Sequence, residues 1–362
     1  MNPPVQIPLL FTTSPFPPYP TAKMHLLPLL LPVLGLIPST AAQSRTTPPS
    51  SSCIRVSKTP SAHSAQFSTL SSAITSLSTT STSPVCIFLY PGTYQEQVLI
   101  PAAIKSPISI YGSTTNSASY TSNSVTITQS KSQANTGASN DETGTVRVKA
   151  NNVKIYNLNI VNSYGKGSQA VALSAYADSG YYGCSFQGYQ DTVLANRGKQ
   201  YYSRCEIVGV TDFIFGQESP AWFERCDIRV LSSSVGYITA SGRSNSASPN
   251  FYVFNNCNIA AKSGQSVNNG AFYLGRPWRE YARVVFQSTA MSGVVNGAGW
   301  RIWNAGDERT SNVYFGEYAN SGPGAGGTRA SFARRLGGPV AIETVLGGDY
   351  KGQGWFDGNY GM

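Results

Sequence analysis

The chain has 362 residues, of which 41% are hydrophobic and only 12% are charged, with 35 Gly and 22 Pro. This length allows one large domain or two small ones, and the low charge favours an extracellular β-rich protein over a cytosolic helical one. The formal net charge of +9 favours a polyanionic partner. Because no Lys/Arg-rich run or aromatic-interleaved basic stretch is present, a nucleic acid is disfavoured as that partner. An acidic polysaccharide and a merely solvated basic surface both remain open.

The N-terminal region is typical of a secretory signal. Residues 24–42 form an apolar run that follows Lys23 and ends in small residues. The run is too short and too rich in proline for a good membrane span. We therefore expect cleavage after Ala41 or Ala42 and an exported mature chain that begins near Gln43 and uses no membrane. We interpret 1–23 as an extended n-region or the result of an upstream start site, 43–52 as a polar linker, and 53–362 as one catalytic domain.

Cysteine and histidine restrict the chemistry. No Cys-x-x-Cys pair occurs, which argues against zinc, whereas export would permit disulfides. The two histidines are His25, in the signal region, and His63, which we expect at the surface. A Ser–His–Asp or Cys–His mechanism would depend on that one residue, so carboxylates are the expected acid–base groups of a hydrolase. The six cysteines are Cys53, Cys86, Cys184, Cys205, Cys226 and Cys257.

Near the start of the domain, an apolar spacing from Phe67 to Leu77 predicts a short helix that caps the first coil of the fold. Further along, a short alternating run recurs about every 21 residues. Its copies are followed by Gly, Asn or Asp turn residues. Short strands at this period predict an all-β solenoid of parallel strands, a single right-handed parallel β-helix with three strands and three turns per coil. The copies are Asn157–Ile160, Gly183–Phe186, Arg204–Ile207, Arg225–Ile228 and Asn256–Ile259.

Residues 21 apart should then lie above one another, with successive coils about 4.8 Å apart. Cys184, Cys205 and Cys226 would form an interior ladder, with Leu158 in the equivalent place upstream. Two states fit this ladder: buried free thiols in an apolar stack, or a disulfide between adjacent rungs. The spacing does not choose between them.

The same period relates the polar residues that could do chemistry. Asp191 and Asp212 differ by 21, and so do Gln169 and Gln190. The two carboxylates should stack on one face with Cα atoms about 5 Å apart, which would raise the pKa of one of them and let it act as an acid. A structural ladder of turn-capping aspartates is the other explanation of this spacing.

The local motifs resemble those of the pectin methylesterase family. In order along the chain they read GTYQE, QAVAL, GYQDT, DFIFG, LGRPW and EY followed by GPGA, and the resemblance covers roughly residues 55–356. The stretch after Asp191 is closer to fungal than to plant members. The motifs are Gly92–Glu96, Gln169–Leu173, Gly188–Thr192, Asp212–Gly216, Leu274–Trp278, and Glu317–Tyr318 with Gly322–Ala325.

The resemblance implies a pectin-lyase-like β-helix that hydrolyses methyl esters of galacturonan. Asp212 would attack the ester carbonyl, and Asp191 would protonate departing methanol and then activate water. Gln169 and Gln190 would donate hydrogen bonds to the oxyanion, since neutral amides stabilise it without suppressing the charge of the nucleophile. Arg276 would orient Asp212 and keep it ionised.

For the substrate, the resemblance implies that Trp278 packs against a sugar ring and that Phe215 and Tyr189 line the same site. It implies methyl-esterified pectin as the partner, no cofactor or metal, an extracellular location and a monomer.

Other functions are compatible with parts of this pattern. A glycosidase or polysaccharide lyase could use the same fold, because carboxylates about 5 Å apart also suit a retaining glycosidase. Polygalacturonases, however, use a histidine together with a close Asp–Asp pair, and pectate lyases use a calcium-binding acidic cluster; neither set is evident in the sequence. A non-catalytic carbohydrate-binding β-helix would not need the two aspartates, two glutamines and Arg276 together, and an acyl-thioester hydrolase would not need Trp278.

Overall fold

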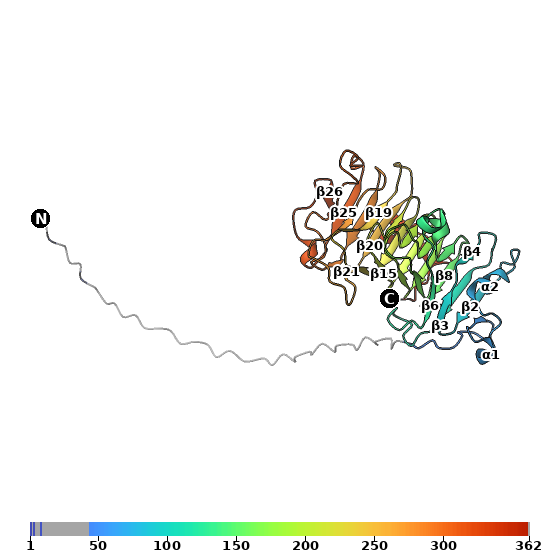
Figure 1. The fold of residues 1–362 in the computed structure, drawn as a ribbon. Coiled ribbons are helices and arrows are strands. Elements are labelled where there is room, and N and C mark those ends of the chain that lie inside the picture. The colour runs from blue at the N-terminus through green and yellow to red at the C-terminus, as the bar shows by residue number, and fades with distance from the viewer. Residues whose placement is uncertain (2, 4–7, 9–42, 361–362) are drawn as a thin grey trace. The chain divides into compact units, whose positions relative to one another are not determined.

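The computed structural model describes residues 1, 3, 8 and 43–360. The expected signal peptide, 24–42, lies outside the described residues. Within the described part of the chain, no helix has the length and apolarity needed to cross a bilayer. Residues 43–360 form a parallel β-helix of three sheets (Figure 1), which confirms the predicted fold class.

The central coils each contribute one strand to each of the three sheets, which have 11, 7 and 8 strands, and neighbouring strands pair in parallel. The first sheet consists of β1 (Ile54–Val56), β2 (Val85–Leu89), β5 (Ile108–Gly112), β8 (Val153–Tyr156), β11 (Ser179–Tyr182), β14 (Gln200–Ser203), β17 (Pro220–Glu224), β20 (Phe251–Asn255), β23 (Arg283–Gln287), β25 (Tyr314–Tyr318) and β26 (Ala333–Arg335). The second sheet consists of β4 (Val98–Ile100), β7 (Val146–Val148), β10 (Leu173–Ala175), β13 (Val193–Ala195), β16 (Ile214–Gly216), β19 (Gly236–Ser241) and β22 (Phe272–Gly275). The third sheet consists of β3 (Gly92–Gln95), β6 (Val125–Gln129), β9 (Asn159–Asn162), β12 (Ser185–Gln187), β15 (Glu206–Gly209), β18 (Asp227–Val230), β21 (Asn258–Ala261) and β24 (Ala290–Met291).

The repeated sequence marks the turn from the first sheet to the third. In each copy the first residue has a left-handed backbone, with φ between +51° and +56°, and the next side chain points into the core. Asn and Gly adopt this conformation most readily. A single left-handed residue thus redirects the chain at the same point of successive coils. The residues in this conformation are Asn157, Gly183, Arg204, Arg225 and Asn256.

The cysteine ladder is interior, as predicted, and it consists of free thiols. Cys184, Cys205, Cys226 and Cys257 are all buried and unbridged. Each thiol donates to a backbone carbonyl of the preceding coil; the Cys205 Sγ, for example, lies 3.5 Å from the Tyr181 oxygen. The thiols therefore donate hydrogen bonds to backbone carbonyls and fill the interior stack, and these four cysteines form no disulfides.

An aromatic ladder on the first sheet fills much of the remaining interior. Tyr181, Tyr202, Phe223, Phe254 and Phe286 come from five successive coils and stack with ring centroids 4.3 to 4.7 Å apart. All five side chains are fully buried. Because each ring stacks on the one a coil away, the register that aligns the rings also aligns the residues of the site.

A short helix closes the N-terminal end of the coil, as the sequence predicted. Helix α2 (Leu70–Thr75) buries Leu70, Ala73 and Ile74 and packs against β1 and β4. The Thr69 side chain accepts from the backbone of the first turn, and the Glu96 carboxylate accepts from two further backbone N–H groups at 2.9 Å. Glu96, in the GTYQE motif, is thus a helix cap.

The remaining helices are short. They are α1 (Pro60–His63), α3 (Gln133–Thr136) and α4 (Ile342–Leu346), with 3-10 turns η1 (Asp141–Thr143), η2 (Pro323–Ala325) and η3 (Tyr350–Gly352). His63 ends α1, is partly exposed and stacks on Tyr90 with ring centroids 4.0 Å apart. It lies outside the cavity described below, as expected for a surface histidine.

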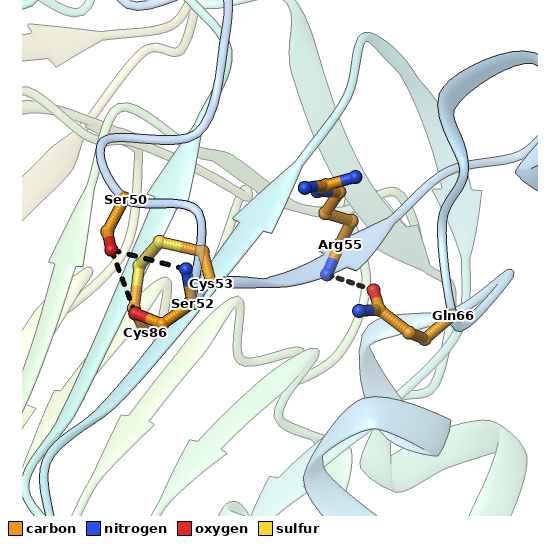
Figure 2. Close-up of a disulfide and its surroundings, with 6 residues drawn as sticks. All are labelled: Ser50, Ser52, Cys53, Arg55, Gln66 and Cys86. Carbon is orange, nitrogen blue, oxygen red and sulfur yellow. Dashed lines mark hydrogen bonds between the residues drawn. A yellow bond between two sulfur atoms is a disulfide. The ribbon is translucent and has the colours of Figure 1, made fainter.

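The disulfide is near the N-terminus. Figure 2 shows the bond between Cys53, which precedes β1, and Cys86 in β2. The bridge joins adjacent strands across a loop of 33 residues, and closing such a loop stabilises the fold mainly by restricting the unfolded chain. No pattern in the sequence predicted this pairing.

The segment 43–52, expected to be a polar linker, begins as an ordered arm. Arg45 pairs with Thr114 through two backbone hydrogen bonds of 2.8 and 3.0 Å, and its guanidinium lies over the Tyr111 ring at 4.7 Å. At the other end of the chain, the Trp355 carbonyl accepts from the Tyr182 hydroxyl at 3.0 Å. Both terminal segments thus pack against the outer tyrosines of the first sheet.

Candidate active site

The two candidate aspartates lie at equivalent points of adjacent coils, just before β13 and β16. The pairings of Gln190 with Thr211 and of Val193 with Ile214 place Asp191 beside Asp212, which confirms the predicted register. Both aspartates have left-handed backbones, with φ of 65° and 50°. Aspartate tolerates this conformation better than most residues, and here it bends the chain where the second sheet begins.

Arg276 holds one of these carboxylates and not the other. Its Nε and Nη2 donate to Asp212 Oδ1 and Oδ2 at 2.9 and 2.7 Å, a bidentate contact. Arg276 follows β22, two coils beyond Asp212. A residue 64 positions away in the sequence thus reaches the same point because the coils stack.

Arg276 separates the chemistry of the two buried aspartates. Asp191 and Asp212 are only 5% and 7% exposed. Burial and the facing charge of Asp212 raise the pKa of Asp191 well above its usual value, with Arg276 and a hydrogen bond from Asn140 offsetting part of the rise. Burial also raises the pKa of Asp212, but Arg276 opposes that rise directly. Asp191 is therefore the better proton donor and Asp212 the better anion.

Both candidate oxyanion donors reach the site, and the predicted register of Gln169 with Gln190 is confirmed. The Ala170 N–H donates to the Gln190 carbonyl at 3.2 Å, just as the Asp191 N–H donates to the Thr211 carbonyl where Gln190 pairs with Thr211, and the register shortens only after these residues. Strands β10 and β13 then pair with an offset of 20 residues, because one extra residue lies between Gln169 and β10. The two glutamines thus occur on adjacent coils. Both line the cavity that contains the aspartates.

That cavity has a volume of about 270 Å³ and is lined by polar, charged and aromatic side chains. The rings of Phe215 and Trp278 lie 6.0 Å apart and pack with Val171 and Leu194 on the outer face of the second sheet. Tyr189 is elsewhere: it packs against the main core and does not line the cavity. The cavity is lined by Asn140, Gln169, Gln190, Asp191, Asp212, Phe215, Ala240, Arg276, Trp278 and Trp303.

This arrangement can perform an acyl transfer. It combines an anionic carboxylate, a neighbouring protonated carboxyl group and two amides that face a common space beside an aromatic surface. In residues 43–360, no group of three or more His, Cys, Asp or Glu side chains is placed to bind a metal.

Comparison with known proteins identifies the family. The Pectinesterase family model matches residues 56–333. The chain is 48% identical over 325 residues to a pectinesterase of Aspergillus aculeatus, covering 89% of this chain and 96% of that protein. The chain belongs to the pectinesterase family. A pectinesterase of Aspergillus niger is 46% identical over 322 residues, covering 88% and 95% of the two chains.

Solved pectin methylesterases share the fold. The deglycosylated enzyme of Aspergillus niger matches with a TM-score of 0.79 at 40% identity, covering 88% of this chain and all of that one. The carrot enzyme matches with a TM-score of 0.72 at 26% identity and the same coverage. Pectinesterases are carboxylic ester hydrolases, so the chain is an enzyme of that class, and the glycosidase, lyase and binding-protein alternatives are set aside.

Three residues around the site of this pectinesterase were missed by the sequence analysis. Asn140 precedes η1, and its Oδ1 accepts from Gln133 Nε2 at 2.9 Å, which leaves its amide N–H groups for Asp191. Tyr237 and Trp303 both contact the Arg276 guanidinium. Asn140, Tyr237 and Trp303 lie outside the motifs that were compared, and none is in a 21-residue relation to a candidate residue, so neither signal could have found them.

Proposed function

We propose that this enzyme hydrolyses the C6 methyl esters of pectin, with Asp212 as the nucleophile and Asp191 as the acid and base. The observation that carries the proposal is the unequal treatment of two buried, adjacent carboxylates. Asp212 is bound by a bidentate Arg276, and Asp191 is not. Two carboxyl groups whose environments separate their proton affinities are the expected pair for acid and nucleophile.

In the first half of the reaction, an Asp212 oxygen attacks the ester carbonyl carbon. The carbonyl electrons move to its oxygen, and the Gln169 and Gln190 amides donate hydrogen bonds to that oxyanion. The oxyanion then collapses, the bond to the methoxy oxygen breaks, and Asp191 gives that oxygen its proton. Methanol leaves, and an anhydride joins Asp212 to the sugar carboxyl.

In the second half, ionised Asp191 accepts a proton from water as the water oxygen attacks the sugar carbonyl. The second tetrahedral intermediate collapses and frees the Asp212 carboxylate and the galacturonate acid, which ionises in solvent. Asp191 is again protonated, so the cycle is closed. The Phe215 and Trp278 rings supply an apolar surface for sugar C–H groups beside the aspartates.

Product analysis of highly esterified pectin tests this function. We expect recombinant enzyme to release methanol while the polymer keeps its length in size-exclusion chromatography. A fall in polymer length without methanol would instead indicate a glycosidase or lyase.

The oxyanion role of the glutamines gives a graded prediction. Gln190→Ala should lower kcat by about 10²–10³-fold, because one of two donors is lost, and Gln169→Ala should have a smaller effect. The matched control is Gln187→Ala, since Gln187 is also partly buried but bonds Ser185 on the third sheet. Equal methanol release by Gln190→Ala and Gln187→Ala would contradict the oxyanion assignment.

We further propose that the mature enzyme begins near Gln43 and acts as an exported monomer. The apolar run 24–42 motivates this start, and the ordered arm supports it, since the Gln43 carbonyl already accepts from the Ser117 N–H at 2.9 Å. N-terminal sequencing of protein from the culture medium should find Gln43 or a neighbour, and light scattering should give one chain. Retention in cells or an N-terminus at Met1 would contradict the processing site.

A further inference from the structure

Aromatic rings and guanidinium groups alternate in a stack beside the aspartates. The guanidinium carbon of Arg276 lies 4.1 Å from the Tyr237 ring centroid and 4.3 Å from that of Trp303. Two rings at these distances cannot share one face of a guanidinium, so Arg276 lies between them. The stack continues with Arg301, 6.0 Å from the Tyr237 centroid, and Arg309, 4.8 Å from that of Trp303.

The two rings constrain the group that binds Asp212. A guanidinium donates hydrogen bonds in its own plane, and both donors to Asp212 lie along one edge of that plane. Rings on its faces oppose rotation out of that plane and keep water from those faces, where cation–π attraction is strongest once water is removed. The Arg276 side chain is accordingly only 17% exposed.

The elements that carry the rings are themselves well anchored. Tyr237 is in β19, and its N–H donates to the Val210 carbonyl at 2.8 Å. Trp303 is held from its other side by Arg309, whose Nη1 donates to the Trp278 carbonyl at 2.5 Å. The stack is therefore tied to a strand at one side and to the loop of the sugar-facing Trp278 at the other.

We propose that Tyr237 and Trp303 are positioning residues that act through Arg276 to hold Asp212 in its attacking orientation, an inference that rests on the proposed role of Asp212. Trp303 lines the cavity and can also contact substrate, whereas Tyr237 does not line it. Tyr237 therefore isolates the positioning effect, because its loss should change the reaction rate and leave substrate affinity nearly unchanged.

The first experiment compares Tyr237→Leu, Tyr237→Phe and Tyr273→Leu. Tyr237→Leu should lower kcat about tenfold with KM within about twofold, and Tyr237→Phe, which keeps the ring, should restore activity. Tyr273 is the matched control, because its ring stacks on Tyr237 with centroids 5.9 Å apart and also contacts Arg301, at 5.4 Å, whereas the ring that contacts Arg276 is that of Tyr237. A rise in KM alone, or equal losses in the Leu and Phe variants, would overturn the inference.

The pH profile of kcat/KM distinguishes positioning of Arg276 from a purely structural role of Tyr237, because a purely structural role would leave this profile unchanged. The charged groups lining the cavity are Asp191, Asp212 and Arg276. In Tyr237→Leu a less firmly held Arg276 would oppose the effect of burial less well, so the pKa of Asp212 would rise further. Because Asp212 must be ionised to attack, the acid limb of kcat/KM should move to higher pH. An unmoved acid limb in a folded variant would count against the proposal.

A double-mutant cycle separates this inference from the catalytic assignment. Tyr237→Leu and Arg276→Ala are combined, and methanol release at high enzyme concentration and the midpoint of thermal unfolding are measured for all four proteins. If Tyr237 acts through Arg276, substituting Tyr237 should change methanol release and the unfolding midpoint little in a protein that already lacks Arg276. Additive losses would overturn the inference. The unfolding cycle does not depend on the reaction, so it remains informative even if Asp212 is not the nucleophile.

Discussion

Asp212→Asn will abolish methanol release while the β-helix remains folded. An amide is far too weak a nucleophile to attack an ester, so we expect a loss of about 10³-fold or more in kcat. The amide also replaces one of the two oxygens that accept from Arg276. Methanol release from esterified pectin is the measurement, with circular dichroism and thermal unfolding to show that the variant folds.

Asp227→Asn is the matched control for this variant. Asp227 is also paired with an arginine, Arg229, and accepts from the Tyr120 hydroxyl at 2.7 Å, but it is on the third sheet and does not line the cavity. It should retain activity. A folded Asp212→Asn enzyme with near-normal methanol release would show that the nucleophile is another group, and the paired aspartates would then be a turn-capping ladder.

Asp191→Asn should be almost as damaging, with a loss of about 10²–10⁴-fold. The amide can neither protonate methanol nor accept a proton from water. In the unmodified enzyme, activity should rise as Asp212 ionises and fall as pH passes the raised pKa of Asp191, because the acid must be protonated. The residual activity of Asp191→Asn should therefore lack the alkaline limb. A pH profile that keeps this limb would assign it to a different group.

Much of the fold followed from one regularity of the sequence. A strand repeat of 21 residues allows each coil to stack on the last, and the strands that directly follow Cys184, Cys205 and Cys226 pair with that period. The period holds at Gln169 and Gln190 but not at the strands that follow them, where one extra residue before β10 shortens the offset to 20. A local extra residue leaves the coils stacked, because the turns of a solenoid absorb it, so no regularity of the sequence could have shown it.

The candidate site was predictable to a similar degree. The period related Asp191 to Asp212, and the motif resemblance added Gln169, Gln190 and Arg276. All five line one cavity. Tyr189 was named from its motif and packs against the core instead. A motif identifies neighbours in sequence, but the face on which a side chain lies depends on the bend at the left-handed Asp191.

Sequence by itself therefore determined the solenoid, its register at Asp191 and Asp212, and the pectinesterase family, because these depend on residues at fixed intervals or in contiguous motifs. Tertiary structure alone decided the Cys53–Cys86 bond, the free state of the thiol ladder, and the contacts of Asn140 with Asp191 and of Tyr237 and Trp303 with Arg276. Each of these features depends on side chains that come from different coils or from the loops between the coils. Their meeting depends on how far the irregular turns carry the chain, and that distance is set by packing and not by sequence spacing.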